Sequence, residues 1–219
     1  MNRKLFFTSV FIFLISVSEK SSAQNLIENG NLDSVYHKDA HFTTCTYNDL
    51  KGNWTYVGTT MTYYKRDSIN LNVIVLLNFL PTLPVNRRSF LETKLNSPLC
   101  ENDTCHLSFS IKANPYLVID RIGAYFSDSL ITIDSVESVT PQVQTPNHVF
   151  YTAPGFTKVY LTYIAKGGEQ YLTIGNFIPK NKSHYKVFPK NKNGEPGEYF
   201  IDDISLEHSC RESESVFRK

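Results

Sequence analysis

A surplus of either charge is missing from this sequence. Among 219 residues, 22 are Lys or Arg and 21 are Asp or Glu, which gives a formal net charge of +1. No basic stripe and no amphipathic helix can be found along the chain. Nucleic acids and anionic membranes attract proteins through clustered positive charge. The composition therefore predicts neither nucleic acid nor a membrane surface as a partner.

The motifs of common catalytic sites are missing too. The chain has no G-x-S-x-G, no H-E-x-x-H and no phosphate-binding loop. Asp202 and Asp203 are adjacent, but neighbouring residues of a strand point to opposite faces, so these two acids cannot flank one glycosidic bond. We find no nucleophile–base–acid arrangement and predict that the protein is not an enzyme.

A hydrophobic run long enough to span a membrane is lacking as well. Residues 5–17 are apolar, but a transmembrane helix needs about 20 such residues. A basic start, MNRK, precedes this run, and Ser21 and Ala23 occupy the small-residue positions of a leader-peptidase site. We predict a signal peptide at residues 1–23 and export to the periplasm, the cell surface or the extracellular space. A retained membrane anchor is the alternative.

Cysteine is scarce, with four residues in the chain. An even number in an exported protein favours disulfides. Cys100 and Cys105 bracket the polar turn ENDT, which predicts a local bridge and leaves Cys45 and Cys210 for each other. Four cysteines allow three connectivities, so the pairing stays open. The chain lacks the C-x-x-C pairs of a zinc site, and this alternative ranks below disulfides.

Helical periodicity is nearly absent, and short alternating segments take its place. Residues 105–113 put Leu107, Phe109 and Ile111 on one face of a predicted strand. Segments 89–95, 121–127, 158–165, 170–177 and 198–206 also resemble strands, with turn signals such as Gly167-Gly168 between them. This pattern predicts an all-β, antiparallel β-sandwich over residues 24–209 with a polar tail at 210–219. The apolar segment 70–86 fits either a buried strand or a loop.

The last predicted strand, EYFIDDISL, contains an acid in an apolar position. Alternation puts Phe200, Asp202, Ile204 and Leu206 on one face, and Tyr199, Ile201, Asp203 and Ser205 on the other. A buried carboxylate needs a cation or hydrogen-bond donors as partners. First and last strands of a sandwich are often neighbours, so the turn at Asn29-Gly30 and the carboxylate of Asp33 become candidate partners. Such an oxygen-rich cage suits Ca²⁺.

The two chain ends also carry a resemblance. NLIENGNLD and YFIDDISL resemble the opening and closing segments of galactose-binding-like jelly rolls, a superfamily that includes many carbohydrate-binding modules. The resemblance implies a structural calcium held by Asp33 and Asp202, with help from backbone carbonyls near Asn29 and Gly30. Here Leu32 and Asp33 replace the usual Phe and Glu.

A closer resemblance covers most of the chain after residue 23. GGEQYLTIGNF, RSFLETKLNSPL, RIGAYFSD and YFIDDISL are together similar to an exported jelly-roll domain of bacterial cell-surface proteins. In many of those proteins this domain precedes a peptidoglycan-binding domain of the outer-membrane-protein-A type. The resemblance implies a jelly roll of the cell envelope.

Aromatic residues near Trp54 are the candidate ligand site. Trp54, Tyr56, Tyr63 and Tyr64 lie close together in sequence, and aromatic faces stack on sugar rings. The alternative is that Trp54 packs in the core. His37, His41 and Cys45 would share one face of a helix and offer metal ligands, but the polar residues among them favour a loop.

The predicted function is an exported, non-catalytic module that binds a glycan or another cell-surface polymer. One alternative is a structural or adaptor module of the cell envelope that binds other proteins. A glycan hydrolase is a further alternative, which lacks an identifiable acid–base pair.

Overall fold

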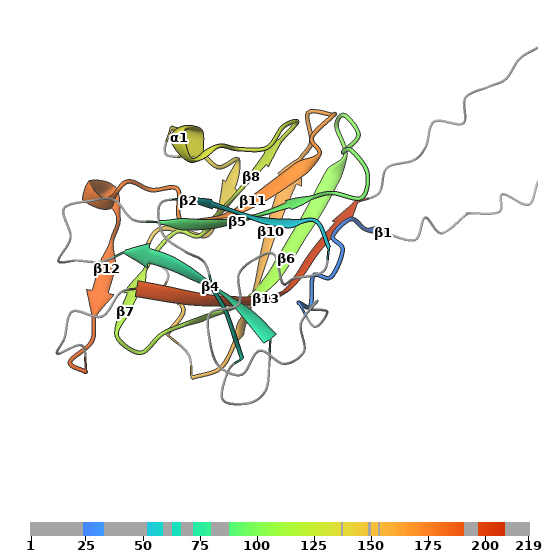
Figure 1. Cartoon of the computed structure of the whole chain (residues 1–219). Coiled ribbons are helices and arrows are strands. Elements are labelled where there is room, and N and C mark those ends of the chain that lie inside the picture. The colour runs from blue at the N-terminus through green and yellow to red at the C-terminus, as the bar shows by residue number, and fades with distance from the viewer. Residues whose placement is uncertain are drawn as a thin grey trace, which may run out of the picture.

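The computed structural model describes residues 24–32, 52–58, 63–66, 72–79, 88–136, 138–148, 150–152, 154–190 and 197–208. Within these residues, nearly all regular structure is β-strand, arranged in two large antiparallel sheets (Figure 1). The predicted fold class, an all-β antiparallel sandwich of the jelly-roll type, is confirmed. The predicted signal peptide and the tail at 210–219 lie outside the described residues.

The first sheet has six strands within the described part of the chain. Its order is β10 (Thr157–Ile164), β6 (Thr104–Ala113), β13 (Gly197–His208), β4 (Asn72–Phe79) and β3 (Tyr63–Arg66), and β1 (Gln24–Asn25) also pairs with β13. The ambiguous segment 70–86 therefore contains a strand, β4, which pairs with both β13 and β3.

The second sheet has five described strands, and a smaller sheet has two. The order in the second sheet is β2 (Trp54–Gly58), β5 (Ser89–Lys94), β11 (Tyr171–Gly175), β8 (Gly123–Ser127) and β9 (Val143–Gln144). The small sheet pairs β7 (Leu117–Ile119) with β12 (Tyr185–Val187). A helical turn, α1 (Ile133–Val136), and a 3-10 turn at Lys180–Lys182 complete the described elements. No helix among the described residues has the length and apolar character needed to cross a membrane.

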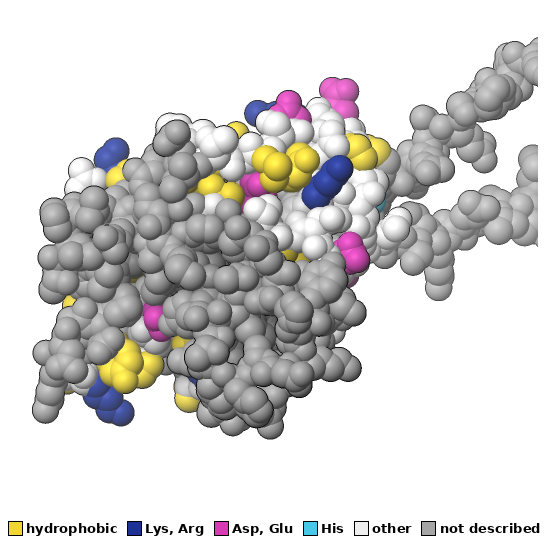
Figure 2. All heavy atoms as spheres, viewed as in Figure 1, with side chains coloured by type: hydrophobic (Ala, Val, Ile, Leu, Met, Phe, Trp, Pro, Cys, Tyr) yellow, Lys and Arg dark blue, Asp and Glu magenta, His cyan; other side chains and the backbone are white. Residues whose placement is uncertain are grey.

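Alternation along the strands builds the core between the two sheets. Leu107, Phe109 and Ile111 of β6 are at most 1% exposed, as their predicted shared face requires. Leu172 and Ile174 of β11 belong to the same buried cluster. Burying one such side chain stabilises the fold by about 1.5–3 kcal/mol. On the described part of the face in Figure 2, Lys and Arg side chains lie among Asp and Glu side chains, without a stripe of one sign.

The two ends of the described chain meet side by side, as the sequence predicts. β1 is antiparallel to the end of β13, and the Leu26 amide donates to the Leu206 carbonyl at 2.8 Å. Further along, the Ile204 amide donates to the Gly30 carbonyl at 2.8 Å. A Cβ at Gly30 would lie 1.9 Å from the Ile204 carbonyl oxygen, so only glycine allows this close approach.

A bulge in β13 corrects the predicted faces of this strand. Asp202 pairs with Ser110 of β6 and Ser205 pairs with Ser108, so the β13 side contains one more residue than the β6 side. Asp203 has a φ of 49°, in the left-handed region. Because the extra residue reverses the alternation, the core-facing set is Tyr199, Ile201, Ile204 and Leu206.

The predicted grouping of Phe200 and Asp202 with Ile204 and Leu206 is therefore wrong. Residues that pair directly across strands share a face. Asp202 shares its face with Ser110, whose neighbours Phe109 and Ile111 point into the core, so Asp202 points to the outer face. It is nevertheless buried, at 8% exposure.

Candidate functional site

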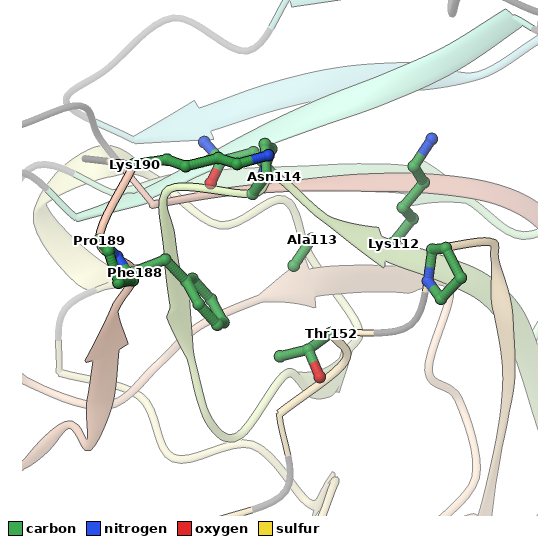
Figure 3. Close-up of a pocket in the computed structure, with 9 residues that line it drawn as sticks. Lys112, Ala113, Asn114, Thr152, Phe188, Pro189 and Lys190 are labelled. Atoms are coloured by element: carbon green, nitrogen blue, oxygen red, sulfur yellow. The ribbon is translucent and has the colours of Figure 1, made fainter. Parts of the chain in front are cut away.

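A cavity of about 600 Å³ lies at the end of β6, beside the small β7–β12 sheet (Figure 3). This volume is within the range of small-molecule sites. Nine residues from three segments line the cavity: Lys112, Ala113, Asn114, Pro115, Thr152, Pro154, Phe188, Pro189 and Lys190. In Figure 3, Phe188 points into the space between Ala113 and Thr152.

The first wall is the turn that leads from β6 into β7. Asn114 is buried, and its side-chain oxygen accepts hydrogen bonds from the Tyr116 and Leu117 amides, both at 3.1 Å. The Asn114 amide donates to the Glu198 carbonyl of β13 at 3.0 Å. These bonds fix the Asn-Pro turn that the sequence indicates, with Lys112 on one side of it.

Backbone hydrogen bonds connect the other two walls to the first. The Phe188 amide donates to the Tyr116 carbonyl at 3.0 Å, which continues the β7–β12 pairing beyond β12. The Ala113 amide donates to the Tyr151 carbonyl at 3.3 Å and so places Thr152 beside β6. The ends of three separate segments therefore converge on one cavity.

The lining combines apolar surfaces with positive charge. Phe188 and the prolines supply apolar surface, and Lys112 and Lys190 are the two positively charged lining residues. In Figure 3, the Lys112 side chain extends away from Phe188 and Thr152. The Lys112 ammonium lies 5.8 Å from the centre of the Phe156 ring and 6.0 Å from that of Phe200, within cation–π range. None of the nine described lining residues is a carboxylic acid. The cavity can therefore bind a polar or anionic ligand against an aromatic ring, but its lining offers no acid–base pair.

The predicted aromatic platform is not supported at Trp54. This side chain is 6% exposed, belongs to the core cluster, and donates its indole N–H to the Glu28 carbonyl at 3.1 Å. The alternative that Trp54 packs in the core is the one the structure shows, because the ring faces into the sandwich from β2. Tyr56 lies on β2, whereas Tyr63 and Tyr64 lie on β3 of the other sheet, and their side chains are outside the described set.

The predicted metal ligands are described in part. Asp33 lies outside the described residues, as do His37, His41 and Cys45. The Asp202 carboxylate accepts the Asp203 amide at 2.7 Å. The Asn29 carbonyl accepts the Leu32 amide at 3.0 Å, and Asn29 has a φ of 51°. The turn at Asn29-Gly30 is thus present beside β13.

The predicted bridge between Cys100 and Cys105 is wrong. Cys105 is a free cysteine with no exposed surface, while Cys100 is disulfide-bonded. Cys45 and Cys210 lie outside the described residues. The physical reason is alternation, because Cys105 begins the inward-facing set of β6 and so points into the core. Burial, with the charges of Asp103 and Glu169, raises the pKa of the Cys105 thiol to about 12, so this group is not a reactive thiolate.

Two buried glutamates, Glu92 and Glu169, accept hydrogen bonds within the core. Glu92 is fully buried, and burial raises the pKa of its carboxyl despite hydrogen bonds from Thr173 and the Ile131 amide. Glu169 accepts the Tyr163 hydroxyl at 2.5 Å and the Lys166 and Gly167 amides at 2.8 and 2.9 Å. Neither carboxylate lines the cavity.

Glu169 also explains the GGEQYLTIGNF segment. Gly167 and Gly168 have φ values of 94° and 90°, as the predicted Gly-Gly turn requires. The turn links β10 of the first sheet to β11 of the second. The carboxylate on its inner side holds this crossover in place.

Sequence reasoning missed the cavity because its residues have no common motif. Lys112 belongs to the polar face of β6, and Asn114-Pro115 was identified only as a turn. Phe188 and Lys190 follow a short strand, β12, that the sequence does not predict. The one available signal is the mixture of Phe, Pro and Lys at 186–190.

Comparisons with known proteins bear on the fold. No protein-family model matches the chain, and no curated protein matches it. The chain is similar to the solved structure of an arabinose-bound GH51 α-L-arabinofuranosidase, with 9% identity and a TM-score of 0.51 over 84% of this chain and 26% of that one. It thus spans about a quarter of that enzyme, and the likeness shows a common fold alone.

Two carbohydrate-binding modules are also among the similar solved structures. One is the CBM22-1 xylan-binding domain of Paenibacillus barcinonensis Xyn10C, with 9% identity and a TM-score of 0.40 over 77% of this chain and 91% of that one. The other is TmCBM61 in complex with β-1,4-galactotriose, with 11% identity and a TM-score of 0.43 over 84% and 97%.

Proposed function

We propose that this protein is an exported, non-catalytic module that binds a glycan in the cavity beside the β7–β12 sheet. The observation that carries the proposal is the lining of this cavity, where an aromatic ring, prolines and two lysines surround a space of about 600 Å³. Sites for small molecules typically combine such apolar walls with a few polar groups that fix orientation.

The chemistry of a sugar matches both kinds of lining group. A pyranose ring has an apolar C–H face that packs on an aromatic ring, here Phe188, and hydroxyl groups around its edge. The Lys190 ammonium group donates hydrogen bonds to hydroxyl or carboxylate oxygens. The Thr152 hydroxyl both donates and accepts.

Binding of the purified exported chain to a panel of neutral and acidic polysaccharides tests this proposal. Phe188→Ala should weaken binding about tenfold or more, which corresponds to the loss of about 1.4 kcal/mol. Tyr160→Ala is the matched control, because Tyr160 is 76% exposed on β10 and does not line the cavity. If no polysaccharide binds, or if the two variants lose affinity equally, the cavity is not a glycan site.

A second candidate function is an adaptor that binds another envelope protein. β10 is at the end of the strand order of the first sheet, and two of its side chains, Tyr160 and Ile164, are 76% and 56% exposed. Unpaired strand edges with exposed apolar residues bind other chains by strand addition. Cross-linking in cells, with one protein recovered in a fixed ratio and lost in Tyr160→Lys, would favour this function.

We also propose that one Ca²⁺ ion joins the two chain ends. The donors fit in type, because Asp202 and the Asn29 and Gly30 carbonyls offer only oxygen. The hydrogen bond from the Ile204 amide to the Gly30 carbonyl supports this placement, because Ile204 is two residues from Asp202 in β13. A carbonyl oxygen has a second lone pair for an ion. When bound, the ion would neutralise the buried Asp202 carboxylate.

A further inference from the structure

A second cluster of polar side chains lies at the opposite end of the β7–β12 sheet from the cavity. Asp120 follows β7, His184 precedes β12, and His148 lies in the segment after β9. One carboxylate oxygen of Asp120 and one ring nitrogen of each histidine lie within 4.8 Å of one another. Asp120 is fully buried, whereas both histidines are exposed, the His184 side chain at 47%.

Hydrogen bonds fix the Asp120 carboxylate in place. Its Oδ2 accepts the His148 amide at 3.0 Å, and its Oδ1 accepts the His184 amide at 3.1 Å. The Arg121 guanidinium nitrogen Nε lies 3.3 Å from Oδ2. Two amide donors and a neighbouring cation stabilise the ionised form, so this carboxylate acts as an acceptor.

The carboxylate in turn determines which His184 nitrogen carries the proton. Nδ1 of His184 lies 2.9 Å from Asp120 Oδ2. Because an ionised carboxylate can only accept, Nδ1 donates its proton, and the lone pair of neutral His184 is on Nε2. Metal-binding histidines characteristically donate the other ring N–H to a carboxylate in this way.

His148 places a second imidazole beside the first. The backbone of His148 is in the left-handed region, with a φ of 61°, and its amide donates the hydrogen bond to Asp120. The centres of the two imidazole rings are 4.0 Å apart, with their planes tilted by 42°. A tetrahedral ion with bonds of about 2.0–2.1 Å holds two nitrogens about 3.4 Å apart. With ring centres 4.0 Å apart, the two imidazoles are close enough for one nitrogen of each to bind the same ion.

We propose that His148 and His184 bind a divalent transition-metal ion, such as Zn²⁺, with Asp120 as the positioning carboxylate and water completing the coordination. Imidazole nitrogens favour Zn²⁺, Cu²⁺ and Ni²⁺ over Ca²⁺ and Mg²⁺. The positive charge of Arg121 offsets the negative charge of Asp120. The site therefore has no excess negative charge to attract a hard cation. The site is separate from the calcium ligands proposed at the chain ends.

Titration of the purified exported chain with Zn²⁺ alone, followed by calorimetry, tests the site. We expect one saturable binding event that is lost in His148→Ala and in His184→Ala. His106→Ala is the matched control, because His106 is an exposed histidine on β6 outside the cluster, and this variant should bind like the original chain. Ca²⁺ should not compete for this event.

The role of Asp120 has its own readout. Asp120→Asn replaces an obligate acceptor by an amide that can donate to Nδ1, which favours the wrong tautomer of His184. Zn²⁺ affinity, measured at a temperature where the variant is folded by circular dichroism, should fall about 10–100-fold. The proposal is overturned if the original chain does not bind Zn²⁺, if both histidine variants still bind it, or if His106→Ala loses binding to the same extent.

Discussion

The hydrogen bond between Tyr163 and Glu169 leads to a prediction with a built-in control. Tyr163 is 5% exposed, its ring stacks on Phe126 at 4.3 Å, and its hydroxyl donates to Glu169 at 2.5 Å. Tyr163→Phe keeps the ring and its stacking and removes only the hydroxyl. Hydrogen bonds to charged groups contribute about 1.5–3 kcal/mol, against about 0.5–1.5 kcal/mol for neutral pairs. We therefore expect Tyr163→Phe to lower the free energy of unfolding by about 1.5–3 kcal/mol. Each kcal/mol should lower the melting temperature by roughly 2–4 °C.

The loss should depend on pH. Burial by itself raises the pKa of Glu169, but hydrogen bonds from Tyr163 and from the Lys166 and Gly167 amides outweigh it and hold the pKa below its ordinary value of 4.5. A carboxyl with a lowered pKa in the folded state stabilises the fold above the unfolded pKa, and this contribution disappears as the pH falls through the folded pKa. Tyr163→Phe raises the folded pKa. The difference in unfolding free energy is therefore largest near pH 7 and narrows below about pH 4.5.

Urea unfolding at several pH values between 3 and 7 measures this difference. Tyr199→Phe is the control, because Tyr199 is 1% exposed and its hydroxyl donates to the neutral Ile119 carbonyl. Its cost should be smaller and nearly constant over this pH range. Equal costs for the two variants, both independent of pH, would refute the conclusion that an ionised Glu169 is held by Tyr163.

Two further predictions concern the junction of the chain ends. Gly30→Ala should destabilise the fold by about 1–3 kcal/mol in urea unfolding, because its Cβ would lie 1.9 Å from the Ile204 carbonyl oxygen. Gly155→Ala is the control: no atom lies within 4 Å of its Cβ, so it should change stability by less than about 1 kcal/mol. Similar effects for both variants would contradict the close approach at Gly30. Ca²⁺ should raise the melting temperature relative to chelator, by an amount equivalent to about 2.7 kcal/mol at a hundredfold excess over Kd. Asp202→Ala should abolish this difference while the exposed Asp128→Ala retains it, and an unchanged melting temperature with chelator in the original chain would exclude the calcium site.

Much of the sandwich could be predicted because strand alternation is a local property. The apolar face of β6 and the Gly-Gly turn before β11 follow from a few consecutive residues. The pairing of β1 with β13 follows from a general rule about first and last strands. In each case, the information lies within one segment or in the topology of the fold class.

The bulge at Asp203 shows where local reasoning fails. Strict alternation assigns Asp202 to the core, but one extra residue on the β13 side of the pairing with β6 reverses the faces. The identity of the partner residues decides this register, and the sequence of β13 alone does not contain it. Cys105 illustrates the same limit, because its proximity to Cys100 in sequence is outweighed by its position on the inward face of β6.

Two of the candidate ligand sites, the cavity and the histidine cluster, depend on the same small sheet, which is why neither could be predicted. Pairing of β7 with β12 is only three residues long, and it joins positions separated by more than 60 residues in sequence. At one end it brings Phe188 to the turn after β6, and at the other it brings His184 to Asp120. Two residues of a third segment also contribute: His148 belongs to the histidine cluster, and Thr152 lines the cavity. Three short segments without a sequence motif meet at each site. The ligand chemistry of the two sites can therefore be recognised only once the pairing of these segments is known.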